Sequence, residues 1–170
     1  MLFLYIYFER GGYVMLDTIK NVTDGKQILE VIHAAFKRYE DDPMPSSALT
    51  ETVSTIKKEL ESNVLILGAE MQGQLVGVVK VTYHKDYIYF SRLSVLLEYQ
   101  GRGIASKLVK YIEKLAVNEQ IPYVHCKVRK SEEANIRLYK KLGFHISIEE
   151  VMTSPLGFVM ETLTMEKKVK

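Results

Sequence analysis

The sequence has little that would indicate a disulfide framework, a metal centre or a nucleic-acid-binding surface. Cys126 is the single cysteine among 170 residues, which excludes an internal disulfide and is typical of the reducing cytoplasm. The four histidines lack metal-ligand spacing, so no metal site is predicted. The formal net charge of +2 is too small for general nucleic-acid binding, because the lysines and arginines cluster little.

A segment that could cross or enter a membrane is also missing. The apolar run 1–8 is too short to span a bilayer, and it lacks the basic region and cleavage site of a secretory signal. We therefore expect a cytoplasmic protein that has no membrane partner. Residues 1–16 are interpreted as an N-terminal extension, either an added β segment at a sheet edge or residues upstream of a natural start at Met15.

The remaining chain, 17–170, is predicted to form one α/β domain. A length of 170 residues suits a single domain, and no repeat or flexible linker divides the sequence. Hydrophobic periods of 2 and 3.6 predict the order β-α-α-β-β-β-α-β-α-β-β, which is a mixed sheet with helices on both faces. The predicted strands are 17–22, 64–70, 75–83, 87–95, 122–128, 144–150 and 157–165, and the helices are 24–39, 49–60, 104–119 and 132–142. Residues 166–170 are interpreted as a solvated tail.

The segment from Leu93 to Ser106 predicts an anion-binding site between a strand and a helix. N–H groups of the loop and of the first helical turn lack helical partners, and they lie at the positive end of the helix dipole. Gly101 and Gly103 let a ligand approach the backbone closely, and Arg102 adds positive charge. The expected ligand is a phosphate or pyrophosphate. The loop alone is equally compatible with an ordinary strand-to-helix turn.

A second motif decides between these alternatives. It is Leu138-Tyr139-Lys140-Lys141-Leu142-Gly143-Phe144, with a tyrosine four residues before the glycine that ends a short helix. With Gln100-Gly101-Arg102-Gly103-Ile104-Ala105, it resembles the GNAT family of N-acetyltransferases. The two segments match that family's Leu-Tyr-x-x-x-Gly-Phe helix end and its pyrophosphate-binding pattern Gln/Arg-x-x-Gly-x-Gly/Ala. Because the order of elements also agrees, the resemblance extends from about Asp17 to Met165.

The resemblance implies acetyl transfer from acetyl-CoA to an amine, and it implies roles for residues of this chain. Tyr139 is the implied general acid, since a phenol with an ordinary pKa of about 10 stays protonated at neutral pH and can donate to a departing thiolate. The backbone of Leu93, Ser94 and Val95 would pair with the pantetheine arm where the sheet splays. The pyrophosphate would be held by Gln100, Gly101, Arg102, Gly103, Ile104, Ala105 and Ser106. The family often has an asparagine where this chain has Glu132, and Asn135, one turn later, is the expected substitute for that cofactor contact.

The general base and the acceptor are not assigned by the sequence. Some members of the family carry a glutamate on the strand before the loop, where this chain has Tyr89, so His84, Glu70 or a chain of water molecules are the alternatives. The expected acceptor is a small amine, such as a polyamine, an amino acid or an amino-sugar. A protein N-terminus or a lysine is a variant of this expectation, and a homodimer is left open.

A non-catalytic acyl-CoA sensor is the alternative from another functional class. Tyr139 argues against it, because a binding module needs no acid beside the sulfur.

Cys126 is interpreted as a packed core thiol rather than a nucleophile. Several strand tyrosines could line an acceptor pocket or pack across strands: Tyr83, Tyr87, Tyr89, Tyr99 and Tyr123.

Overall fold

A computed structural model describes residues 18–169 and contains seven strands and four α-helices within them. The predicted N-terminal extension, including Met15, lies outside the described residues. The order of elements is the predicted one, and the α/β class is confirmed. The strands are β1 (Thr18–Asn21), β2 (Leu65–Met71), β3 (Gln74–Tyr83), β4 (Tyr87–Val95), β5 (Tyr123–Arg129), β6 (His145–Thr153) and β7 (Val159–Lys168). The helices are α1 (Gly25–Phe36), α2 (Val53–Glu61), α3 (Ile104–Asn118) and α4 (Glu133–Lys141), with 3-10 turns η1 (Lys37–Tyr39), η2 (Ser47–Thr50) and η3 (Leu97–Tyr99).

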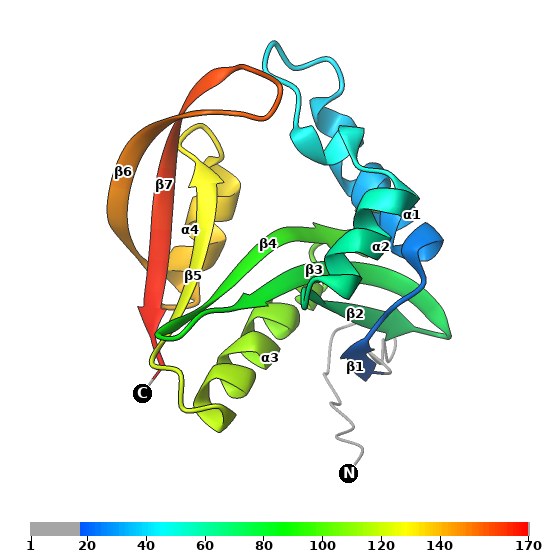
Figure 1. The fold of residues 1–170 in the computed structure, drawn as a ribbon, viewed down its shortest axis with the longest axis horizontal. Helices are drawn as coiled ribbons and strands as arrows, with labels where there is room; N and C mark the ends of the chain where they lie inside the picture. Colours follow the sequence, from blue (N-terminus) through cyan, green and yellow to red (C-terminus); the bar gives the residue numbers. More distant parts are fainter. Residues whose placement is uncertain (1–17, 170) are drawn as a thin grey trace.

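The seven strands form one mixed sheet in the order β1-β2-β3-β4-β5-β7-β6 (Figure 1). Strands β4 and β5 are the parallel neighbours, and the other pairs are antiparallel. The β4–β5 ladder is short, because it runs only from Tyr87 opposite Tyr123 to Phe90 opposite Cys126. Beyond these residues the two strands diverge, and the predicted splay of the sheet is confirmed (Figure 1).

Helices cover both faces of the sheet and divide the core into two clusters. On one face, α1 and α2 pack Ile28, Ile32 and Ile56 against Ile66 and Val78, all of them fully buried. On the other face, α3 and α4 close a larger cluster, whose members include Leu108, Ile112, Phe90, Tyr139 and Phe144. Among residues 18–169, no helix is both long and apolar enough to cross a bilayer.

Helix α1 begins where the sequence predicts, whereas α2 begins later. The Asp24 carboxylate accepts hydrogen bonds from the backbone N–H groups of Lys26 and Gln27, so it caps α1. The predicted helix from residue 49 is wrong at its start, since Leu49 belongs to the separate turn η2. Thr52 and Thr55 exchange side-chain and backbone hydrogen bonds of 2.8 and 3.2 Å, and this capping box begins α2 at Val53.

The prediction of a solvated C-terminal tail is also wrong. Strand β7 continues to Lys168, which lies opposite Tyr123 at the start of β5. The Lys167 ammonium lies 2.8 Å from a carboxylate oxygen of Glu113 on α3. The consecutive charged residues 166–168 form a strand because β5 supplies a ladder and Glu113 supplies an ion pair. Both partners are remote in sequence, so no local pattern indicates them.

Candidate active site

The divergence of β4 from β5 is accompanied by a bulge in β4. The pairing with β3 shifts between Val78 and Lys80, and Arg92 in β4 has φ +53°, which is uncommon for a residue with a side chain. The Ser94 hydroxyl donates to the Arg92 carbonyl at 2.8 Å and closes the bulge. The predicted pantetheine-binding residues therefore begin within the bulge at Leu93 and continue through Ser94 and Val95, on the part of β4 that has no ladder with β5.

The loop that follows β4 leaves the first turn of α3 open to a ligand. Gly101 and Gly103 both have φ +75°, and a Cβ atom at either would meet no other atom within 4 Å. Gly103 is the N-cap of α3 and supplies no side-chain hydrogen bond to the helix. The N–H groups of the first turn are therefore uncapped by a side chain at the positive end of a 15-residue helix. This geometry suits an anion.

The other predicted loop residues hold the loop in place. The Gln100 side-chain amide donates to the Val95 carbonyl at 3.1 Å, and Arg102 donates to the Glu98 carbonyl at 3.1 Å. Ile104 buries its side chain in the core at 2% exposure, so only its backbone N–H can face a ligand. Ala105 and Ser106 are half-buried in the first turn of α3.

A cavity of about 370 Å³ occupies the opening between β4 and β5. Its walls come from the diverging strand ends, from α4, from the 36–47 region and from the β6–β7 hairpin. A volume in this range suits a small ligand or the reactive end of a larger one. Of the residues that the sequence assigned to the site, Leu93, Asn135 and Tyr139 line this cavity.

Tyr139 is the buried phenol of the site. Its side chain lies in an edge-to-face contact with Phe90 at 5.6 Å between ring centroids, and in a tilted contact with Phe144 at 6.0 Å. The residue is 7% exposed, and burial raises the pKa of its hydroxyl well above the ordinary value. No hydrogen bond of this hydroxyl to another described residue is found. The hydroxyl is thus protonated at neutral pH and free to donate to a ligand in the cavity.

A cluster of polar side chains in the cavity wall was not predicted. The Tyr39 hydroxyl donates to a Glu132 carboxylate oxygen at 2.6 Å, and Arg38 contacts both of these residues. Arg129, at the end of β5, donates to the backbone carbonyls of Met44 and Pro45. Burial, with the hydrogen bond to Glu132 as the second cause, raises the pKa of Tyr39 to about 12. Periodicity assigned Tyr39 only to an apolar helix face, and no local signal joins residues 38–39 to residues 129–132.

The groups suggested as general base lie elsewhere. His84 stacks on Tyr87 at the opposite end of β4, and Glu70 forms an ion pair with Lys20 at the β1–β2 edge. Tyr89 does line the cavity, while Tyr87 and Tyr123 contact the His125 ring. Of the described residues lining the cavity, Glu132 alone carries a carboxylate.

Cys126 also faces this cavity from β5, but its thiol is not reactive. It is 1% exposed, and burial raises its pKa to about 12. Because the thiolate is the nucleophilic form, the thiol is inert at neutral pH. Within residues 18–169, no group of three His, Cys, Asp or Glu side chains is placed to hold a metal ion.

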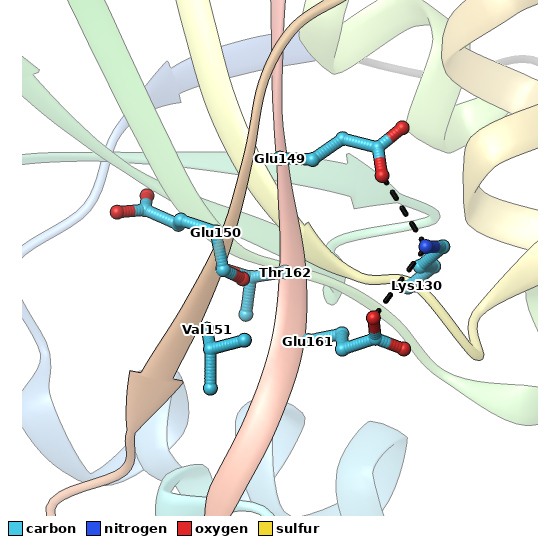
Figure 2. A pocket seen from close by; sticks show the side chains of 6 residues that line it. All are labelled: Lys130, Glu149, Glu150, Val151, Glu161 and Thr162. Atoms are coloured by element: carbon cyan, nitrogen blue, oxygen red, sulfur yellow. Dashed lines mark hydrogen bonds and ion pairs between the residues drawn. The ribbon is translucent and has the colours of Figure 1, made fainter.

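A second, smaller hollow of about 170 Å³ lies on the β6–β7 hairpin and is less suited to catalysis (Figure 2). Figure 2 shows the Lys130 ammonium between two carboxylates, at 3.2 Å from Glu149 and 3.5 Å from Glu161. The positive charge of Lys130 is therefore already neutralised by these two carboxylates. The cavity at the splayed strands remains the candidate active site.

Comparison with known proteins connects this geometry to a family. The model of the acetyltransferase (GNAT) family matches residues 27–144, which include β4, the glycine loop and the end of α4. The chain belongs to this family. The predicted resemblance is confirmed.

Individual GNAT relatives agree with the assignment. An acetyltransferase from Pectobacterium atrosepticum is 37% identical over 82 residues, which are 47% of this chain and 57% of that protein. An acetyltransferase from Sodalis glossinidius is 34% identical over 84 residues, which are 48% of this chain and 58% of that protein. The matched region therefore spans little more than half the length of these curated relatives.

Solved structures show the same fold. The ribosomal-protein-S18-alanine N-acetyltransferase of Escherichia coli has a TM-score of 0.73 at 16% identity, covering 90% of this chain and 94% of the other. An acetyltransferase from Salmonella typhimurium, solved with its cofactor acetyl-CoA, has a TM-score of 0.66 at 17% identity, covering 90% and 94%. At these identities the likeness concerns the fold alone.

The GNAT chain described here has features that fit acetyl-CoA. Two glycines leave open space at the uncapped end of α3, where a pyrophosphate would be held. The end of β4 has no ladder with β5, so its backbone groups on that side could pair with an extended pantetheine arm. The cavity beyond that end contains Tyr139 and Asn135 on one face of α4.

Proposed function

We propose that this protein is an acetyl-CoA-dependent N-acetyltransferase with Tyr139 as its general acid. The observation that supports it most directly is the place of the Tyr139 hydroxyl. This hydroxyl is buried and protonated, and it has no hydrogen-bond partner among the described residues. Tyr139 lines the cavity between the splayed strands, which Leu93 also lines.

When bound, acetyl-CoA supplies an acetyl group activated as a thioester. The N–H groups of Gly101 to Ser106 hold the pyrophosphate, and the backbone of Leu93 to Val95 orients the pantetheine arm. A neutral amine forms the new C–N bond as the C–S bond breaks, and Tyr139 donates its proton to the sulfur. The proton lost by the amine nitrogen returns to the Tyr139 phenolate through water, so the net products are an amide and a free thiol.

The cavity volume favours a small amine over a folded protein surface as the acceptor. A protein N-terminus is the second candidate, because the E. coli structure of similar fold is named as an enzyme that acts on a ribosomal-protein alanine. An extended peptide end, unlike a folded surface, can enter a cavity of about 370 Å³.

Acetyl-CoA is expected to raise the melting temperature of the protein and to release thiol when suitable amines are added. A ligand that binds only the native state at 100 times its Kd stabilises that state by about 2.7 kcal/mol. Differential scanning fluorimetry and a thiol-release assay with an amine panel test the two parts separately. No thermal shift at saturating acetyl-CoA contradicts the proposed binding, and a shift without thiol release favours the sensor.

Ser106→Glu is expected to weaken acetyl-CoA binding by about tenfold or more without destabilising the fold. A glutamate in the first turn of α3 suits the helix dipole, yet it places negative charge where the pyrophosphate should lie. Ser106→Gln is the matched control, since it has nearly the same size and no charge. Calorimetry gives the Kd of acetyl-CoA for each variant. Equal Kd values for Ser106→Glu and Ser106→Gln would mean that the phosphates of acetyl-CoA bind elsewhere.

A further inference from the structure

The charged side chains around the cavity are paired, with one exception. Three cations line it, namely Arg92, Lys127 and Arg129. Arg92 lies 2.6 Å from a carboxylate oxygen of Glu51, and Lys127 lies 2.6 Å from one of Glu150. Arg129 has no ion pair with any carboxylate in residues 18–169, and its hydrogen-bond acceptors are the two backbone carbonyls of Met44 and Pro45.

The partners of Arg129 leave its charge uncompensated. Backbone carbonyls are neutral, at 2.6 Å for Met44 and 3.2 Å for Pro45, and a guanidinium has five N–H donors in total. The cavity's carboxylate, Glu132, is occupied by the Tyr39 hydroxyl and by Arg38, which lies outside the cavity lining. A half-buried guanidinium whose acceptors are neutral keeps its full charge and further N–H donors for an anion that enters the cavity.

The environment of Arg129 also fixes the direction of its guanidinium. The group lies over the Tyr39 ring at 5.9 Å from the centroid, and the two carbonyl contacts hold it from the 44–45 segment. A guanidinium held in this way is preorganised for a planar oxyanion, which it binds through two parallel hydrogen bonds. Arg129 and Tyr139 line the same cavity, so a small acceptor bound there can place an anionic group at Arg129 while its amine faces the thioester.

We infer that Arg129 binds an anionic group of the acceptor, so that the substrate is a small amine carrying a carboxylate or a phosphate. This inference rests on the proposed function, because it concerns the acceptor of the same reaction. It favours amino acids and aminoalkyl phosphates over polyamines, which carry only positive charge and would be repelled by Arg129.

Matched pairs of amines test the inference. The pairs are β-alanine with β-alaninamide and aminoethyl phosphate with ethanolamine, so that one arm reports on carboxylates and the other on phosphates. The wild-type protein should have a higher kcat/KM for the anionic member of at least one pair. Arg129→Met should lower kcat/KM for that member by about 10- to 100-fold and leave the neutral member nearly unchanged. Equal values for both members with the wild-type protein would overturn the inference.

Two control variants separate binding from a structural role. Lys127→Met removes a cavity cation that Glu150 already neutralises, and it should leave the preference for the anionic amine unchanged. Arg129→Lys keeps the charge but loses the planar fork, and it should retain part of the preference for the anionic amine. This variant serves as the test if Arg129→Met does not fold. If Arg129 only fastens the 44–45 segment, Arg129→Met lowers kcat/KM equally for both members, and this result would also overturn the inference.

A binding measurement keeps this inference distinct from the proposed function. With the protein saturated by coenzyme A, the anionic amine should bind to the wild type and bind about 10- to 100-fold more weakly to Arg129→Met by calorimetry. Equal binding to both proteins, or no binding to either, overturns the role of Arg129. Failure of every amine to release thiol counts instead against the acetyltransferase activity.

Discussion

Tyr139→Phe is expected to lower the rate of acetyl transfer by about 100- to 10,000-fold and to leave acetyl-CoA affinity nearly unchanged. Phenylalanine keeps the ring contacts with Phe90 and Phe144, so the packing of α4 against β4 is preserved. The hydroxyl has no hydrogen-bond partner among the described residues, so its removal leaves no buried group unsatisfied. The variant should therefore fold as stably as the wild type.

The kinetic measurement has to isolate the chemical step. A donor used only as the sulfur departs lowers kcat and kcat/KM together when removed. If product release limits turnover, the fall in kcat is masked, so single-turnover rates are the decisive quantity. Tyr89→Phe is the matched control, because Tyr89 also presents a phenol to the cavity, although it is only half-buried, and the substitution should have a small effect. A Tyr139→Phe protein with wild-type single-turnover rates would make Tyr139 a packing residue.

The parts of the fold that the sequence predicts are those with a local signal. The glycine loop illustrates this, because Gly101 and Gly103 both adopt φ +75° and no neighbour in space is needed to explain them. Gly143, with φ +91°, ends α4 for the same reason. The motif around Tyr139 is equally local, since both its glycine and its tyrosine belong to one helix end.

The remaining parts depend on contacts between distant residues. The Tyr39–Glu132 hydrogen bond joins the turn η1 to the N-cap of α4 across 93 positions, and the two contacts of Arg129 span 84 and 85 positions. The bulge at Arg92 likewise leaves no trace in the alternating pattern of β4. The cofactor end of the site is thus predictable from short motifs, whereas the acceptor end is assembled by tertiary packing.

Glu51→Gln is expected to lower the free energy of unfolding by about 3 kcal/mol. Glu51 is the shared anion of a partly buried cluster that includes Arg92 of the β4 bulge. One of its carboxylate oxygens lies 2.8 Å from the Lys80 ammonium and the other 2.6 Å from Arg92. The side chain of Lys80 is only 4% exposed and that of Glu51 12%, so neither charge is well solvated.

The expected size of the effect follows from what each cation retains. Lys80 keeps Glu59 at 2.5 Å, but Glu59 is 38% exposed and more strongly screened. Among residues 18–169, the remaining side-chain partner of Arg92 is the Ser47 hydroxyl at 3.0 Å. Removing one partner from a buried ion pair typically costs about 3–5 kcal/mol, and the remaining contacts place this substitution at the lower end.

Urea unfolding measures the loss, and two further variants identify its cause. Glu30→Gln removes a carboxylate from an exposed helical pair with Lys26 and should hardly change the midpoint. In the double variant Glu51→Gln/Lys80→Met, the unpaired ammonium is gone, so part of the stability lost in Glu51→Gln should return. That recovery is expected because the cost comes from a buried charge without its partner, not from a missing contact. If Glu51→Gln keeps the wild-type midpoint and m-value, water reaches Lys80 and Arg92, and the cluster does not hold the bulge of β4 in place.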